Sequence, residues 1–475
     1  MRKTLILLAV LGTSVFSMNA QKSEKDIIKK LEQKSDEYGN IAQNIWEFAE
    51  MGYQEEQSSG LLQKTLKDAG FSIKTGVAGI PTAFIAEYGS GSPVIAIMGE
   101  YDALPGLSQK ATAEKESAGA AAGHACGHHL FGTASTAAAI STKEWLEANK
   151  AKGTIRFYGT PAEEGGSGKV YMVREGLFND VDIALHWHPG SQNAASAGAA
   201  LANKSAKFRF HGISAHAAGS PEKGRSALDG VEAMNLMINM MREHIPQEAR
   251  IHYVITAGGK APNVVPDFAE VYYYARHNRR DVVIDIFERM VKAAEGAALG
   301  TGTTMDYEMI GGTHELLPNL TLQKVMHDNL SEVGGIEYTA EEKEFADKIA
   351  VTLGQEKADL ATAKNVQPYK TEARAYGSTD VGDVSFTVPT VGFGTATWVP
   401  GTPAHSWQAV AAGGTSIGRK GMMVAAKTLT KTAIDLFKDK KLVETAKAEF
   451  LEKRGADFKY IPLLGDRAPA LDYRK

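Results

Sequence analysis

The chain has 475 residues, a formal net charge of −4, 43% hydrophobic residues and a single cysteine. A chain of this length exceeds what one hydrophobic core usually serves, so we expect two domains. The absence of a basic excess, or of any run of Lys and Arg, argues against a nucleic-acid partner. One cysteine excludes an intrachain disulfide.

The first 20 residues have the composition of a secretory signal. Arg2 and Lys3 precede a mostly apolar run at residues 4–16, and Ala20 offers a small residue for cleavage. The run is short for a membrane span, and no cysteine follows it to carry a lipid. We therefore expect residues 1–20 to be removed and the protein to be exported, periplasmic or secreted, with no membrane span afterwards. An N-terminal anchor that stays attached is the alternative.

Residues 21–198 alternate between helical and strand patterns. Helical periodicity covers residues 23–50, 58–69 and 130–146, and strand patterns cover residues 82–88, 93–99, 153–158 and 182–187. This alternation predicts an α/β catalytic domain with an open, mostly parallel sheet. Candidate chemical groups follow directly after several of these strands, which is where open α/β sheets bind their ligands.

A different pattern occupies residues 199–312. Strands are expected at residues 204–212, 250–256, 269–276 and 303–309, with helices at 226–243 and 281–297. The order β-α-β-β-α-β predicts a ferredoxin-like domain inserted into the first. The catalytic domain then resumes over residues 313–475, with a helix from about 319, a strand at 390–395 and a long helix at 409–437. The tail after Lys438 matches no functional pattern.

Metal-ligand residue types gather in G-H-A-C-G-H-H at residues 123–129. Cys126 and His128 combine a thiolate with an imidazole, which is a typical ligand set for zinc and its neighbours. A lone cysteine is more often a small buried apolar residue. Four Cys and His residues within this one segment nevertheless favour a metal site.

Further candidate ligands lie in three other motifs. Glu163 and Glu164 follow a strand, and of two adjacent acids one can bind a cation while the other moves protons. His186 and His188 are two apart, so both face one side of a strand, and His405 lies in a turn after a strand. If the fold brings these residues together with Cys126 and His128, they supply ligands for two ions roughly 4 Å apart.

The segment G-G-S-G-K at residues 165–169 is not a phosphate-binding loop. Glu163 stands where that motif requires its first glycine, and Val170 replaces its Ser or Thr. The sequence also holds no G-x-S-x-G nucleophile elbow.

Eight segments together resemble the aminoacylase and carboxypeptidase family of di-metal amidohydrolases, and most closely its aminobenzoyl-glutamate utilisation protein B branch. They are G-E-Y-D-A-L-P-G (99–106), G-H-A-C-G-H-H (123–129), P-A-E-E-G-G (161–166), L-H-W-H-P (185–189), A-H-A-A (215–218), A-P-N-V-V-P-D-F-A-E-V (261–271), G-S-T-D-V-G-D-V-S (377–385) and G-T-P-A-H-S (401–406). Each segment alone is a weak signal. Together they run in the family's order over nearly the whole chain after residue 20.

The resemblance implies a role for each candidate in the catalytic domain. The residues that match the family's metal ligands are Cys126, His128, Glu164, His188 and His405, with Cys126 bridging two divalent ions, zinc or manganese. Glu163 matches the general base, and Asp102 matches an acid that supports a metal-side group. The family often has Asp or Asn at position 129, where this chain has His129. Because branches differ over the His186 and His188 positions, that one ligand stays open, with His188 preferred.

The resemblance also implies roles for three residues of the inserted domain, which is a lid in that family. His216 matches a residue that stabilises the oxyanion, and Asn263 and Arg276 match residues that hold the substrate's carboxylate end. Without the resemblance, Arg276 reads as an ordinary surface residue and Asn263 as a turn residue. Since lids of this family commonly form the dimer interface, a homodimer is expected.

The implied function is metal-dependent hydrolysis of an amide bond by a metal-activated water. The expected substrates are small molecules, namely N-acyl amino acids or aminobenzoyl-glutamate-like amides. A dipeptidase or carboxypeptidase with the same di-metal site is one alternative. A metal-dependent binding protein without turnover is another, and the intact Glu163 argues against it because a binder needs no free base.

Overall fold

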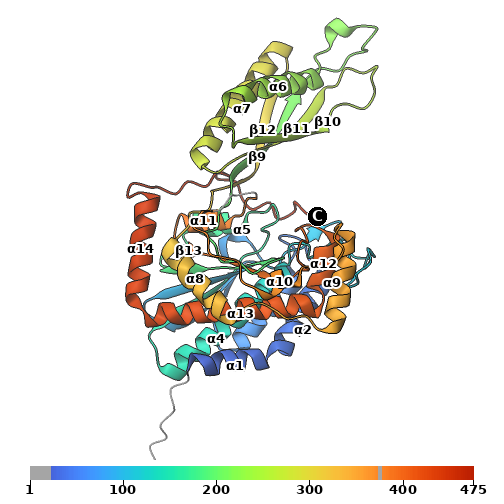
Figure 1. The fold of residues 1–475 in the computed structure, drawn as a ribbon. Coiled ribbons are helices and arrows are strands. Elements are labelled where there is room, and N and C mark those ends of the chain that lie inside the picture. Colours follow the sequence, from blue (N-terminus) through green and yellow to red (C-terminus); the bar gives the residue numbers. More distant parts are fainter. Residues whose placement is uncertain (1–22, 373–376) are drawn as a thin grey trace, which may run out of the picture.

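The computed structural model describes residues 23–372 and 377–475, so the expected signal segment lies outside the described residues. A larger body and a smaller one are joined end to end (Figure 1). In the described part of the chain, no helix has both the length and the apolar character needed to cross a membrane.

The larger body is built on a six-stranded sheet of order β1-β2-β6-β3-β7-β13. Its strands are β1 (Ser72–Thr75), β2 (Phe84–Ser90), β3 (Val94–Gly99), β6 (Gly153–Gly159), β7 (Ile183–Leu185) and β13 (Thr390–Val391). The neighbouring strands β6, β3, β7 and β13 are parallel, whereas β1 and β2 join the edge antiparallel. The sheet is therefore mixed, with a parallel half that carries the candidate site. Two short pairs flank it, β4 (Leu104–Pro105) with β5 (Ala122–Gly123) and β8 (His188–Gly190) with β14 (Gly394–Ala396).

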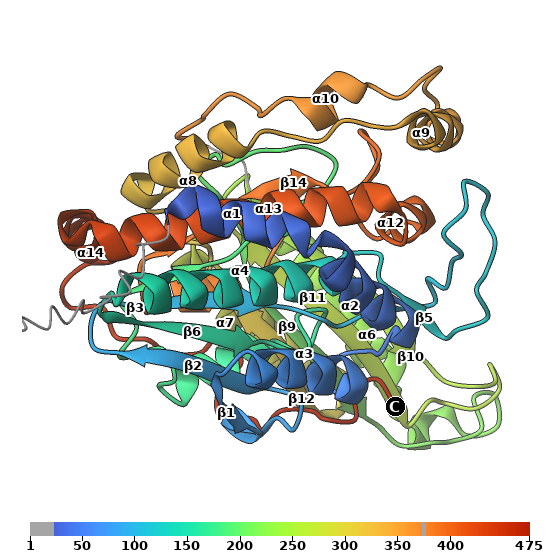
Figure 2. The same cartoon turned by 90° about the horizontal axis from the view of Figure 1, so that it is seen from below.

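Alternate residues of β3 enter two different apolar clusters, as expected for a central strand. Ile95 and Ile97 pack on the face covered by α4 (His128–Asn149) and α13 (Ser416–Lys438), which lie side by side (Figure 2). Ala96 and Met98 pack on the opposite face, with residues of α5 (Gly168–Arg174) and α11 (Val381–Ser385). The remaining helices of this body are α1 (Glu24–Gln33), α2 (Ser35–Phe48), α3 (Glu56–Asp68), α8 (Leu320–Val333), α9 (Ala340–Thr352), α10 (Leu360–Lys364), α12 (Trp407–Gly413) and α14 (Lys440–Arg454).

Two long helices expected from the sequence are interrupted. Residues 23–50 form α1 and α2, and residues 409–437 form α12 and α13. At the second break the side chain of Thr415 accepts a hydrogen bond from the Ile417 N–H at 3.3 Å, which caps a new helix after Gly414. The expected strand at residues 390–395 is likewise split into β13 and β14.

The smaller body, here called the lid, runs from β9 to β12. Its elements are β9 (Ala202–His211), α6 (Ala227–Met241), β10 (Arg250–Ala257), β11 (Phe268–His277), α7 (Arg280–Thr301) and β12 (Thr304–Thr313). The sheet order is β10-β11-β9-β12, all neighbours are antiparallel, and the lid has an apolar cluster of its own. This is the element order predicted from the sequence.

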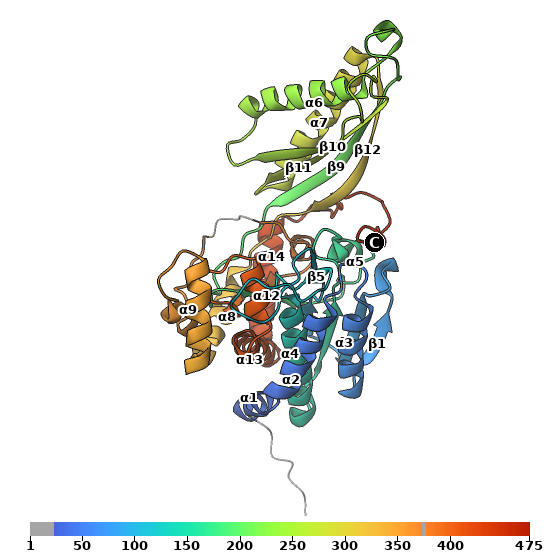
Figure 3. The ribbon, with the colours of Figure 1, turned by 90° about the vertical axis from the view of Figure 1, so that its right-hand side faces the viewer.

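Both connections to the larger body lie at one end of the lid. Ala202, where β9 begins, pairs with His277, and Thr313, where β12 ends, pairs with Asn203. The loops that follow β9 and β10 therefore lie at the opposite end, far from the larger body (Figure 3). A ten-residue strand such as β9 spans about 30 Å.

Candidate metal centre

The carboxyl ends of three neighbouring parallel strands meet at one place. Gly99 of β3 lies opposite Gly159 of β6, and Ile97 lies opposite Leu185 of β7. The segments that leave these strands carry Glu100 and Asp102, Glu163 and Glu164, and His188. Parallel strand order thus gathers side chains that are far apart in sequence.

The five residues expected to bind metal fall into two groups that share Cys126. Cys126, His128 and His188 offer ligand atoms within 4.8 Å of one another, and so do Cys126, Glu164 and His405. A third such group consists of Glu100, His128 and Glu163. A thiolate common to two groups is the arrangement expected of a ligand that bridges two ions.

Cys126 and His128 are presented by a tight turn at the start of α4. Gly127 has φ 78°, and a Cβ there would stand 2.6 Å from the Cβ of Pro189, so only glycine fits. The other two histidines of this segment face away from the centre. The ring of His124 donates to the carbonyl of Ile45 at 2.9 Å, and the ring of His129 donates to that of Gly413 at 3.1 Å.

Asp102 orients two of the expected ligands. It accepts a hydrogen bond from His128 Nδ1 at 2.8 Å and another, through its second oxygen, from the Glu164 N–H at 2.9 Å. His128 Nε2 therefore keeps its lone pair for the centre. A carboxylate behind a metal-bound histidine is a common arrangement that fixes the tautomer and the ring.

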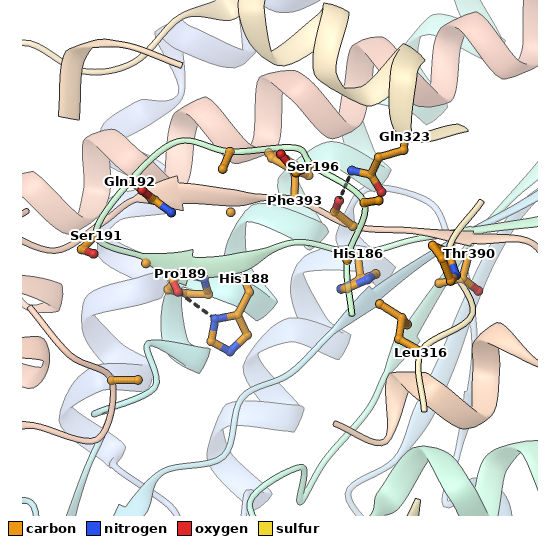
Figure 4. Close-up of a pocket in the computed structure, with 18 of the residues that line it drawn as sticks. His186, His188, Pro189, Ser191, Gln192, Ser196, Leu316, Gln323, Thr390 and Phe393 are labelled. Atoms are coloured by element: carbon orange, nitrogen blue, oxygen red, sulfur yellow. Dashed lines mark hydrogen bonds between the residues drawn. The ribbon is translucent and has the colours of Figure 1, made fainter. Parts of the chain in front are cut away.

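The geometry favours His188 over His186 as the ligand left open by the sequence. His188 Nδ1 donates to the carbonyl of Pro189 at 2.7 Å, which leaves Nε2 facing Cys126 Sγ at 3.4 Å (Figure 4). His186 belongs to none of the three groups found among the described residues. Its ring lies against Gly392, where a Cβ would stand 2.1 Å from His186 Nε2.

A cavity of about 510 Å³ adjoins the centre and has both histidines in its wall (Figure 4). Much of the remaining wall is apolar, including Leu316, Phe393 and Trp398. The side-chain amide of Gln323 donates to the carbonyl of Gly392 at 2.9 Å and closes one side.

The two adjacent glutamates have opposite electrostatic environments. Burial, followed by the charges of Glu100 and Glu164, raises the pKa of Glu163 well above its usual value. Burial acts on Glu164 in the same direction, but the neighbouring His405 and His128 outweigh it and lower its pKa. Glu163 therefore suits a group that accepts a proton, and Glu164 suits an ionised ligand.

Unpartnered polar atoms indicate that the centre fits cations. In the described ranges, Glu100 Oε2, His128 Nε2 and Glu164 Oε1 are buried without a hydrogen-bond partner. Such atoms are rare in folded proteins because leaving them unpaired is costly. A mixture of thiolate, imidazole and carboxylate donors is appropriate to zinc and neighbouring divalent metals.

The expected lid residues do not all lie together within one chain. His216 Nδ1 accepts hydrogen bonds from the Ala218 and Gly219 N–H groups at 3.2 and 3.0 Å, so its proton resides on the exposed Nε2. The carbonyl of Asn263 accepts from the Ala217 N–H at 3.0 Å, which places Asn263 beside the His216 loop at the far end of the lid. Arg276 lies towards the other end, where its guanidinium stacks on Tyr274 at 5.0 Å from the ring centroid.

The sequence matches Peptidase family M20/M25/M40 over residues 96–409. The chain belongs to this family. It is 44% identical over 439 residues to one of the subunits of the p-aminobenzoyl-glutamate hydrolase of Escherichia coli (strain K12), and the match covers 87% of this chain and 91% of that protein. It is 28% identical over 438 residues to the Xaa-Arg dipeptidase of Mus musculus, covering 89% of this chain and 90% of that protein.

Solved structures of low sequence identity share the fold of this M20 chain. A putative aminohydrolase from methicillin-resistant Staphylococcus aureus has a TM-score of 0.64 at 17% identity and covers 87% of this chain and 99% of its own. An aminobenzoyl-glutamate utilization protein from Klebsiella pneumoniae has a TM-score of 0.61 at 19% identity, covering 86% and 98%.

A buried charge network that the sequence did not predict lies beside the candidate metal centre. Lys169 Nζ lies 2.6 Å from Glu100 Oε1 and 2.7 Å from Asp380 Oδ1, and all three residues are at most 2% exposed. Glu100 and Asp380 stand within segments that resemble the family, whereas Lys169 ends the glycine-rich segment rejected as a phosphate loop. A lysine between glycines and an apolar run was the one available signal.

Two further supports of the Glu163–Glu164 loop come from distant parts of the chain. Glu55 accepts a hydrogen bond from the Ala162 N–H at 2.8 Å. Tyr473 and Arg474 in the C-terminal tail donate to the carbonyl of Glu164 at 3.0 and 2.9 Å. The tail, which had no predicted role, thus contacts the backbone of an expected metal ligand.

Proposed function

We propose that this protein is a di-metal amidohydrolase that cleaves N-acyl amino acids or aminobenzoyl-glutamate-like amides. The observation that carries the proposal is the convergence of two three-residue ligand groups on Cys126, with Glu163 beside them in a third group with His128. The substrate class is supported by the 44% identity to the p-aminobenzoyl-glutamate hydrolase chain of Escherichia coli. Dipeptide hydrolysis is a second candidate, favoured by the similarity to the Xaa-Arg dipeptidase.

The chain's own residues divide the work. Cys126, His128 and His188 would hold one ion, and Cys126, Glu164 and His405 the other, with zinc or manganese as the metal. Bound divalent ions supply a Lewis acid for the amide carbonyl and lower the pKa of a water. Glu163 accepts a proton from the attacking water and delivers it to the leaving amine nitrogen.

The substrate is held by groups around this centre. The cavity beside His188 receives the acyl group against Leu316, Phe393 and Trp398, since apolar walls suit an aryl or alkyl chain. Arg276 binds the carboxylate of the amino-acid part, because its planar fork matches a carboxylate. The Nε2–H of His216 donates to the oxyanion that forms during attack.

The ferredoxin-like lid forms a homodimer in this proposal. Edge strand β10 exposes Tyr253, Val254 and Ile255, and helix α6 exposes Leu236, Met237 and Met240. An open strand edge with apolar side chains is a surface that a second chain covers. His216 and Asn263 then act in the partner's site, which removes the difficulty that they lie far from the centre of their own chain. Export to the periplasm or the medium is proposed from the composition of the first 20 residues.

Metal analysis combined with turnover tests the proposal. Purified protein should contain close to two ions per chain and should hydrolyse members of a panel of N-acyl amino acids, p-aminobenzoyl-glutamate and Xaa-Arg dipeptides. Glu163→Gln should abolish turnover while nearly retaining the metal, and Glu164→Gln should lose metal. One ion or none under metal-replete conditions, or equal metal loss in both variants, would contradict the assignment.

A further inference from the structure

Glu100 presents an unused carboxylate oxygen to the candidate metal centre. Its side chain is 2% exposed, and Oε2 lies 3.1 Å from His128 Nε2. Neither atom has a hydrogen-bond partner, so the pair lacks hydrogen-bond geometry despite its short separation. Two ligand atoms of one ion lie at such a distance from each other, because metal–ligand bonds of about 2 Å bring neighbouring ligand atoms into van der Waals contact.

The other oxygen of Glu100 is fixed by Lys169. Lys169 Nζ bonds Glu100 Oε1 at 2.6 Å, and Asp380 holds the lysine through both its Nζ and its backbone N–H, at 2.7 and 2.9 Å. Lys169 is fully buried, so it has no solvent alternative to these partners. The contacts of Lys169 with Glu100 and Asp380 therefore prevent Glu100 from turning Oε2 away from His128.

We propose that Glu100 is a further ligand of the ion that His128 holds, and that Lys169 is the residue that positions it; Glu100 offers its ligand atom within 4.8 Å of those of His128 and Glu163. The inference rests on the proposed di-metal function and adds a sixth protein ligand to it. The two ions then differ in the protein ligands that bind them. The ion that His128 holds gains Glu100 as a protein ligand, while the ion at Cys126, Glu164 and His405 keeps three. An ion with fewer protein ligands keeps an open position for water.

Zinc titration against a competing chelator tests this role without measuring activity. Glu100→Ala should lower the affinity for one of the two ions by at least about tenfold and leave the other within threefold, because only one ion loses a ligand. Lys169→Met should weaken the same ion by about 10–100-fold, as expected of an outer partner of a ligand. Glu342→Gln is the matched control, because it also removes a buried glutamate's ion pair, with Lys420 at 2.6 Å, away from the centre.

Each outcome bears on the proposal. Two ions bound to Glu100→Ala with wild-type affinities would overturn it and would leave Glu100 only an ion-pair partner of His128. If Glu100→Ala does not fold, the nearly isosteric Glu100→Gln decides by the same titration, with wild-type affinity again overturning the proposal. The wild-type ion count tests the di-metal function separately: fewer than two ions would reject that function, whereas two ions insensitive to Glu100 would reject this inference alone.

Discussion

Complementation between two inactive variants tests whether the active site is shared across a dimer. Within one chain, the loop that carries His216 lies at the end of the lid opposite to its connections, a strand length of about 30 Å away. If His216 serves the partner's site, mixing a Glu163→Gln chain with a His216→Ala chain brings both lesions into one site of the mixed dimer and leaves its other site intact. We expect each variant alone to be inactive or nearly so, since loss of one oxyanion donor lowers kcat by about 10²–10³.

The expected recovery follows from the symmetry of a two-fold dimer. Random exchange of equal amounts gives about half mixed dimers. In a mixed dimer one site has both lesions and the other has neither, so half of its sites are intact. Roughly a quarter of wild-type activity should therefore return.

The assay is hydrolysis of an N-acyl amino acid after exchange, with the mixed dimer quantified by native mass spectrometry. Mixing Glu163→Gln with Glu164→Gln is the matched control, because both lesions belong to a site formed by their own chain and no intact site arises. Absence of recovery in the first mixture, with exchange verified, would refute the shared site and would require His216 to reach its own centre.

Three other predictions concern residues around the centre. Arg276→Ala should reduce kcat/KM for substrates with a free α-carboxylate far more than for their amidated analogues, and an equal loss on both would make Arg276 structural. Asp102→Asn should weaken metal binding about 10–100-fold in equilibrium dialysis, because it disturbs the Nδ1 bond that orients His128. Burial, followed by the charge of Asp102, raises the pKa of Glu55 from 4.5 to about 8. The folded metal-free protein thus binds an extra proton between these values, so Glu55 makes stability fall as pH rises from about 4.5 to 8. Glu55→Gln should remove that part of the pH dependence in thermal melts, and an unchanged profile would contradict the raised pKa.

Local patterns were sufficient for most of the fold. The strands before Glu100, Glu163 and His188 are apolar runs, and their parallel order follows from alternation with helices. The break between α12 and α13 was missed although Gly413 and Gly414, followed by the cap residue Thr415, are local signals for it. The split at residues 390–395 depends on pairing with two different strands, β7 and β8, and tertiary pairing of this kind leaves no local signal.

The site was predictable by residue type but not by orientation. His124, His128 and His129 have similar sequence surroundings, yet only His128 turns its ring towards Cys126, and the other two bond backbone carbonyls. That difference depends on where the carbonyls of Ile45 and Gly413 lie, and both come from other parts of the chain. The resemblance already preferred His188 over His186, and the structure adds that its Nδ1 donates to the Pro189 carbonyl.

The electrostatics of the centre connect its outer residues to its ligands. Glu100, Asp102 and Asp380 are buried and Glu163 is half-buried beside them, and Lys169 is the one lysine of this network. Buried carboxylates without enough positive charge are costly, and they either bind protons or bind cations. The raised pKa of Glu163 represents the first response, in the metal-free protein. Two bound divalent ions would neutralise these carboxylates in place of protons. The burial that makes the unneutralised carboxylates costly therefore also contributes to the affinity of the centre for metal.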